Sequence, residues 1–143
     1  MKRMLLTFVI LSIFFVCSAP NTAVCYIQEV GLIKPFDPML HSFIKVESNF
    51  NDTVINRLGY GGCLQIGQEM VDEVNRICKK EGNPSRYVLE DRLNRGKSIE
   101  MWYIVQNYWN PLYDLKRATK IWNPLASKRY YNKIKLYMTS VSS

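Results

Sequence analysis

Six segments whose apolar residues recur at helical spacing place the tightest limit on the fold of this chain. The first begins at Asp37-Pro38, where an acceptor side chain precedes a proline suited to the first turn of a helix. No two strand-like segments are joined by a two-residue hairpin turn. The sequence therefore predicts an all-α fold of about six helices with little strand; the segments are 37–47, 68–81, 88–93, 98–108, 112–122 and 128–138.

The length of the chain predicts one domain. Its 143 residues are enough to bury a core, and a hydrophobic fraction of 48% with 13% aromatic residues argues against disorder. The tetrapeptide WNPL occurs twice, at 109–112 and 122–125, but two copies are too few for a repeat architecture. We therefore expect a single globular domain.

The first residues have the pattern of a secretory signal. A basic start at 1–3 precedes an apolar run at 4–16 and small residues at 18–23, and the run is shorter than the roughly 20 residues that span a bilayer. We predict a signal peptide at 1–23, cleaved after Ala19 or Ala23, and a folded domain at 24–143. The protein is then exported, to the periplasm or outside the cell, and meets a membrane only for export.

The cysteines leave two points open. Cys17 follows the apolar run and would be the lipid attachment site of a lipoprotein, but Val16 stands where such signals usually have a small residue, which disfavours lipidation. Cys25, Cys63 and Cys78 remain after cleavage. An odd number permits one disulfide and one thiol, and the spacing does not say which residues pair.

The charge favours an anionic partner. The formal charge is +7, and it is +5 without Lys2 and Arg3. The other Lys and Arg residues are scattered along the chain and not clustered with aromatic residues, which disfavours nucleic acid. An exported protein meets the polymers of the cell envelope first.

Glu47 lies where helical spacing predicts an apolar residue. Leu40, Ile44 and Glu47 fall on one helix face, although most glutamates in proteins are surface acids. Beside Phe43 or Phe50 the charged form would be desolvated and the pKa of the carboxyl raised. A carboxyl that keeps its proton near neutral pH can protonate a glycosidic oxygen as the sugar leaves. We therefore predict that Glu47 is the catalytic residue.

Residues 47–51 (ESNFN) and 59–66 (GYGGCLQI) resemble the signature of soluble lytic transglycosylases and goose-type lysozymes. That signature is Glu-Ser-x-aromatic-Asn followed at a fixed distance by Gly-aliphatic-x-Gly-Leu-Met-Gln, and the interval here agrees without insertion. Trp122-Asn123 is similar to the aromatic-Asn element of the family, and 130–134 (YYNKI) resembles its tyrosine-containing final helix. The helix at 98–111 also resembles the connecting helix of small members, so the resemblance covers about 36–135.

This resemblance implies a lysozyme-like fold and an enzyme that cleaves the β-1,4 bond between N-acetylmuramic acid and N-acetylglucosamine in peptidoglycan. It implies one catalytic glutamate, assistance from the N-acetyl group of the substrate, and no cofactor; a 1,6-anhydro product is expected. The alternatives are a hydrolytic muramidase and a lysozyme-like envelope-binding scaffold with weakened activity. Pro124-Leu125, without a glycine before Lys128, departs from the family pattern and favours the scaffold.

The resemblance also implies substrate-binding residues with polar side chains. Ser48 would hold the carboxyl of Glu47, or else bond a backbone carbonyl at the helix end. Gln65 and Asn123 offer both donors and acceptors to an amino sugar, or else tie loops together.

Three aromatic residues complete the predicted site. Tyr60, Trp122 and Tyr131 would stack on sugar rings, although aromatic residues at helical spacing are more often part of the core. Tyr130 is an equal candidate to Tyr131.

Other chemistry has little support in the sequence. His41 is the only histidine, so no Ser or Cys triad can be assembled, and the acids and cysteines lack metal-ligand spacing. Asp52, Glu69 and Asp91 are available as a second acid, but no motif points to them. Wall turnover, phage entry and opening the wall for an envelope-spanning secretion or conjugation machine all require the same bond to be cut.

Overall fold

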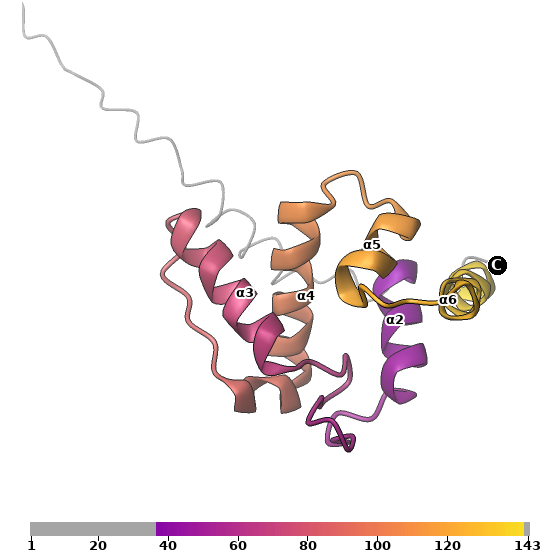
Figure 1. Cartoon of the computed structure of the whole chain (residues 1–143), viewed down its shortest axis with the longest axis horizontal. Coiled ribbons are helices and arrows are strands. Elements are labelled where there is room, and N and C mark those ends of the chain that lie inside the picture. Colours follow the sequence, from indigo (N-terminus) through magenta and orange to yellow (C-terminus); the bar gives the residue numbers. More distant parts are fainter. Residues whose placement is uncertain (1–36, 142–143) are drawn as a thin grey trace, which may run out of the picture.

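The computed structural model describes residues 37–141 (Figure 1), so the predicted signal peptide, its cleavage point, Cys17 and Cys25 lie outside the described residues. The prediction of an all-α single domain is confirmed. Two isolated β-bridges, at Ile55–Gly61 and Gly61–Ile66, are the only extended pairing within 37–141. The helices are α2 (Pro38–Ser48), α3 (Gln68–Lys80), the 3₁₀ helix η1 (Leu89–Leu93), α4 (Arg95–Trp109), α5 (Leu115–Trp122) and α6 (Lys128–Val141).

Helix α4 runs through the middle of the domain. Figure 1 shows α3 on one side of it and α5, α2 and α6 on the other, and α3 contacts α4 while α2 contacts α6. Trp102 of α4 is fully buried, and Phe43 of α2 meets it edge-on at 5.9 Å between ring centroids. Phe43 also meets Trp122 of α5 edge-on at 6.5 Å. These aromatic contacts join α2, α4 and α5, and the buried face of α3 completes the core. No helix of residues 37–141 is both long and apolar enough to cross a bilayer.

Side-chain caps set where α2 and α4 start. Asp37 accepts a hydrogen bond from Met39 N at 2.9 Å, as the sequence predicts. Asn94 caps α4 through Lys97 N, so α4 begins at Arg95 and not at residue 98. These caps supply acceptors for N–H groups that have no partner within the helix.

The fifth helix is shorter than predicted. Asp114 accepts from Arg117 N at 2.7 Å and caps α5, which starts at Leu115 and not at residue 112. The preceding residues turn instead: Asn110 Nδ2 donates to Asp114 O at 3.0 Å, and Tyr113 has a φ of 51°. Asp114 is the third residue of the predicted segment 112–122, and its capping hydrogen bond sets the start of α5 even though the apolar spacing begins earlier.

The segment 49–67 connects α2 to α3 without a helix, yet it is tightly held. Gly62 has a φ of 77°, and a Cβ there would lie 1.8 Å from Arg92 O, so only glycine fits. Arg92 is buried and donates from Nη1 to Gly59 O at 2.5 Å. The segment is therefore fixed against η1, and Leu64 and Ile66 enter the core with Gln65 between them.

Both described cysteines are free. Cys63 and Cys78 are buried thiols, and neither forms a disulfide with the other. Burial raises the pKa of the Cys63 thiol to about 11, which keeps it protonated.

Candidate active site

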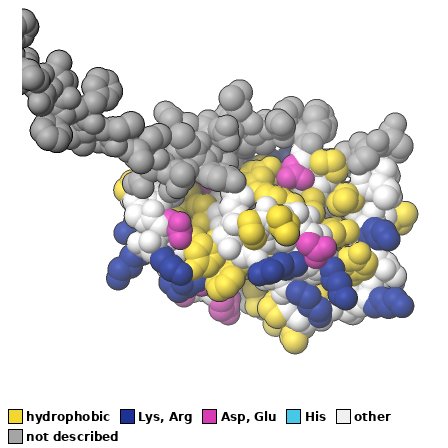
Figure 2. Space-filling view, turned by 90° about the horizontal axis from the view of Figure 1, so that it is seen from above, with side chains coloured by type: hydrophobic (Ala, Val, Ile, Leu, Met, Phe, Trp, Pro, Cys, Tyr) yellow, Lys and Arg dark blue, Asp and Glu magenta, His cyan; other side chains and the backbone are white. Residues whose placement is uncertain are grey.

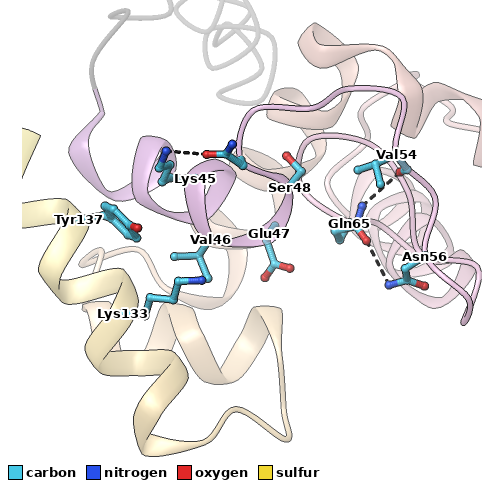
Figure 3. A pocket seen from close by; sticks show the side chains of 10 residues that line it. Lys45, Val46, Glu47, Ser48, Val54, Asn56, Gln65, Lys133 and Tyr137 are labelled. Carbon is cyan, nitrogen blue, oxygen red and sulfur yellow. Dashed lines mark hydrogen bonds between the residues drawn. The ribbon is translucent and has the colours of Figure 1, made fainter.

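Glu47 lies in the last turn of α2 and lines a cavity of about 530 Å³. Three parts of the chain build the cavity: the end of α2, the segment 49–67, and α6 (Figure 3). Glu47 is therefore at the meeting point of elements that are distant in sequence. The lining residues are Lys45, Val46, Glu47, Ser48, Asn49, Val54, Asn56, Gln65, Lys133 and Tyr137.

The hydroxyl of Tyr130, on α6, donates a hydrogen bond to Glu47 Oε1. Burial raises the pKa of Glu47, while this hydrogen bond and the charge of Lys133 lower it by less, so the pKa lies above its ordinary value. Burial and the nearby Glu47 charge also raise the pKa of Tyr130, so the phenol remains a donor. The site thus holds a carboxyl whose pKa is raised by burial and a phenol that donates a hydrogen bond to it.

Glu47 is the only carboxyl that lines this cavity among residues 37–141. Lys133 extends from α6 toward Glu47 and is the charged group that acts on its titration (Figure 3). Of the three other acids considered as partners, Asp52 pairs with Arg95 at 2.9 Å and Asp91 pairs with Lys97 at 2.7 Å. Glu69 lines a neighbouring cavity and not this one. No second acid therefore stands ready beside Glu47 in the described part of the chain.

Ser48 does not hold the carboxyl of Glu47. Its hydroxyl donates to Cys63 O at 2.9 Å and accepts from Asn51 N at 3.1 Å. The prediction of an orienting role is wrong, and the alternative of bonding backbone groups at the helix end is correct. Ser48 instead joins the end of α2 to both ends of the segment that follows it.

Gln65 also has the structural role that was the alternative to sugar binding: it ties parts of the loop together. Its Nε2 donates to Val54 O at 3.2 Å and to Gly62 O at 3.1 Å, and its Oε1 accepts from Asn56 at 3.1 Å. The side chain ties the segment 49–67 together while one face lines the Glu47 cavity. The φ of Gln65 is 50°, a left-handed conformation that turns its side chain away from the buried residues on either side.

A second cavity of about 310 Å³ adjoins the first at Gln65. Tyr60 lines it and is 36% exposed. Trp122 lines it with one edge, but the ring is 9% exposed and its Nε1 donates to Leu64 O at 3.1 Å. Tyr60 is therefore available for stacking, whereas Trp122 is mainly a core residue. The lining residues are Tyr60, Gln65, Ile66, Gly67, Glu69, Met70, Glu73, Ile121, Trp122 and Pro124.

The structure does not bring the last two predicted residues to Glu47. Asn123 ends α5, and its Oδ1 accepts from Leu125 N at 3.1 Å, so it shapes the turn. Tyr131 lines a third cavity, of about 490 Å³, between α5 and α6. The tyrosine beside Glu47 is Tyr130, one residue earlier.

Sequence reasoning missed seven of the ten lining residues, among them Lys133 and Asn56. Lys133 is three residues after Tyr130, and residues three apart on a helix share a face, so choosing Tyr130 would have found it. Asn56 carries no such signal, because it lies in the irregular segment.

A scan of protein-family models and searches of curated proteins and solved structures find no match to this chain. Within residues 37–141 no three His, Cys, Asp or Glu side chains form a group that would hold a metal ion. What the described site contains is a desolvated carboxyl, a phenol that donates to it, and a cavity large enough for part of a polar ligand. This arrangement suits general acid catalysis.

Proposed function

We propose that the protein is a lytic transglycosylase that cleaves the β-1,4 bond between N-acetylmuramic acid and N-acetylglucosamine in peptidoglycan. The observation that carries the proposal is the carboxyl of Glu47, which is desolvated and accepts a hydrogen bond from Tyr130. It is the one carboxyl of residues 37–141 that lines a cavity of about 530 Å³. The motif resemblance supplies the substrate, and the geometry supports a single-acid mechanism.

In the first step Glu47 donates its proton to the glycosidic oxygen. The bond from that oxygen to the anomeric carbon of the muramic acid breaks, and the carbonyl oxygen of the N-acetyl group assists by bonding to the carbon. The raised pKa of Glu47 favours the protonated form that this step needs. Tyr130 then donates to a full negative charge, which strengthens its hydrogen bond as charge develops.

In the second step Glu47 is the base. Its carboxylate takes the proton of the C6 hydroxyl, whose oxygen attacks the anomeric carbon and displaces the N-acetyl oxygen. The product is a 1,6-anhydro sugar, and Glu47 ends protonated as it began. No water enters the balance, which fits a cavity in which Glu47 is the only lining acid of the described residues.

The hydrolytic muramidase would need a group that holds the attacking water. Asp52, Glu69 and Asp91 are the acids available for that role. Asp52 and Asp91 each already form an ion pair, and Glu69 lines the second cavity and not the one that holds Glu47. Their positions favour the transglycosylase over the muramidase.

The scaffold alternative rests on Pro124, which lines the second cavity where the family pattern has glycine-containing residues. The ring of a proline at this position keeps the backbone farther from a bound sugar than a glycine would. Loss of turbidity of purified cell walls would separate an active enzyme from this scaffold.

Mass analysis of fragments released from purified murein tests the reaction. We expect muropeptides that end in 1,6-anhydro-muramic acid and resist borohydride reduction. Fragments that are one water heavier and reducible would establish the muramidase, and no release by the wild-type protein would support the scaffold.

Export is part of the proposal, because the substrate lies outside the cytoplasm. The pattern of residues 1–23 predicts a mature chain that starts at Pro20 or Val24. Intact-mass measurement on the exported protein checks it: a retained Met1, or a lipid on Cys17, would contradict the cleaved and soluble form.

A further inference from the structure

The third cavity, between α5 and the start of α6, is lined by positive charge alone. Lys116, Lys120 and Lys128 line a space of about 490 Å³, and no acid of the described part of the chain lines it. Its other lining residues are neutral: Thr119, Ala126, Ser127, Tyr131 and Asn132. A cavity of this composition favours an anionic ligand.

No acid of residues 37–141 forms an ion pair with any of these three ammonium groups. Lys120 donates to Ala126 O at 3.0 Å, which fixes its charge at the cavity wall without cancelling it. The ion pairs found within residues 37–141 involve other cations, so neither Lys116 nor Lys128 has an acidic partner there. An anion in the cavity would relieve their mutual repulsion.

The imbalance extends over the whole C-terminal part of the described chain. Residues 115–141 contain seven Lys or Arg and no Asp or Glu, whereas residues 37–114 contain nine Lys or Arg and eleven Asp or Glu. The formal charges are +7 and −2. The basic character of the described domain therefore comes from α5, α6 and their connection. Figure 2 shows several Lys and Arg side chains (dark blue) on the right of the molecule, the side on which Figure 1 places α6.

Two leucines at the ends of α5 are almost completely exposed. Leu112 is 91% exposed and Leu125 is 93% exposed, and they are the last residues of the two WNPL copies. The tryptophan of each copy, Trp109 and Trp122, is anchored through an indole N–H hydrogen bond. Each copy thus fixes its tryptophan to the domain and leaves its leucine in solvent, where an apolar side chain gains free energy by being covered.

Leu125 stands directly before Ala126 and Ser127, which line the basic cavity. A soluble anionic polymer would neutralise the lysines but leave this leucine uncovered. A bilayer with anionic head groups satisfies both, because phosphates sit at the level of the lysines and acyl chains lie just beneath. The combination therefore selects a lipid surface over a soluble polyanion.

We propose that Lys116, Lys120, Lys128 and Leu125 form a surface, here called the α5–α6 basic surface, that docks the protein on an anionic lipid bilayer. The cavity holds a phosphate-bearing head group, and Leu125 enters the acyl boundary. This contact is separate from export and does not depend on the chemistry at Glu47.

Binding of the full chain to vesicles tests the proposal. Partition coefficients are measured for phosphatidylglycerol and for phosphatidylcholine vesicles, and the readout is the ratio of the two. Any binding through the apolar run at 4–16 is common to all variants and to both kinds of vesicle, so it cancels in this ratio. We expect the double variant Lys116→Gln/Lys128→Gln to lower the ratio by about 20-fold, roughly fivefold for each lysine near the surface. Lys120 is left in place because it holds the connecting loop.

Leu125→Ser tests the apolar part, because removing the inserted side chain weakens binding to phosphatidylglycerol vesicles by about tenfold at high salt, where charge is screened. The matched control is Arg57→Gln/Lys79→Gln, which removes two exposed cations outside the surface. It lowers the ratio less than twofold.

Three results would overturn the proposal. One is a ratio that the Lys116/Lys128 variant leaves unchanged. Another is an equal loss in the Arg57/Lys79 control, which would show that binding depends on the net charge of the protein and not on this surface. The third is wild-type protein that binds soluble polyphosphate but shows no preference for phosphatidylglycerol vesicles. In that case the surface would bind phosphate groups but would not dock on a lipid bilayer.

Discussion

The two walls of the Glu47 cavity are built on different principles (Figure 3). One wall is the segment 49–67, which has no helix. Hydrogen bonds from the side chains of Ser48, at the end of α2, and of Gln65 to backbone carbonyls of the segment hold it in place. The other is α6, whose Tyr130 and Lys133 act on the carboxyl of Glu47. The polar side chains of the first wall thus serve structure, and those of the second serve the acid.

The contrast follows from where backbone hydrogen bonds are made. A helix satisfies its internal N–H and C=O groups by itself, so polar side chains on α6 are free to face the cavity. The irregular segment lacks that pattern and recruits Ser48 and Gln65 to supply partners for carbonyls of Cys63, Val54 and Gly62. Substitutions on α6 should therefore change activity, and substitutions in the segment should first change stability.

Glu47→Gln, at the junction of the two walls, should have the largest effect. The amide keeps the shape and still accepts the Tyr130 hydrogen bond, but it has no acidic proton, so wall cleavage should fall by at least about 1,000-fold. Release of soluble muropeptides measures this. Glu90→Gln, an exposed acid on η1, is the control and should keep full activity. Substantial cleavage by Glu47→Gln would reject Glu47 as the catalytic acid.

The same variant should be more stable than wild type at pH 8. Because burial raises the pKa of Glu47, the folded protein keeps this proton at pH values where the unfolded chain has lost it. Its contribution to stability is full below the ordinary pKa of 4.5 and is lost as pH rises through the folded pKa. Thermal midpoints should therefore differ more at pH 8 than at pH 4. A gap that widens toward acid would contradict the desolvated carboxyl.

The adjacent tyrosines give the sharpest test of the α6 wall. Tyr130→Phe removes a hydrogen bond to a charged group and should lower cleavage by about 10- to 100-fold with little change in the helical circular-dichroism signal. Tyr131→Phe alters the other cavity and should change cleavage less than twofold. Equal losses in the two variants would show that the face of α6 that carries Tyr130 has no special role in cleavage.

Ser48→Ala should act on stability and not on the acid. It leaves Cys63 O and Asn51 N without their shared hydroxyl partner, which should cost about 1 to 2 kcal/mol in the free energy of unfolding. Ser42→Ala is the matched control, since the Ser42 hydroxyl bonds only a carbonyl within α2, and it should cost less than about 0.5 kcal/mol. Urea denaturation of both variants decides whether Ser48 is a structural link.

Lys133→Gln should give the smallest effect, a shift in the pH profile. The charge of Lys133 lowers the pKa of Glu47, so its removal should raise that pKa and move the alkaline limb of cleavage to higher pH. Activity on the alkaline side should rise about two- to fivefold. Lys135→Gln, exposed on the same helix and outside the cavity lining, should leave the profile unchanged. A shift toward acid would contradict the influence assigned to Lys133.

Local sequence patterns were sufficient to predict that the helices exist and that Glu47 lies at the end of the first of them. The cap at Asp37 and the spacing of Leu40, Ile44 and Glu47 depend only on neighbours within three turns, and the structure places them as predicted. The start of α5 was harder, because the apolar spacing continues through residues 112–114 while Asp114 caps the helix.

Contacts between distant segments were beyond local patterns. Tyr130 and Tyr131 are separated by about 100° around a helix, and which of them meets Glu47 depends on how α6 crosses α2. Ser48 likewise finds its partner in Cys63, fifteen residues away across an irregular segment. Spacing along a sequence does not specify such crossings, so the alternatives stayed open.

The pairing of α2 with α6 joins the first and last described helices, which lie side by side in Figure 1. The hydrogen bond between Glu47 and Tyr130 spans 83 residues, and that between Leu64 and Trp122 spans 58. Contacts between such distant residues form late, because the entropy of closing a long loop must be lost before the contact stabilises it. A growing chain that still lacks α6 therefore has Glu47 without its Tyr130 hydrogen bond, and the environment of this carboxyl is completed only when the last described helix joins the first.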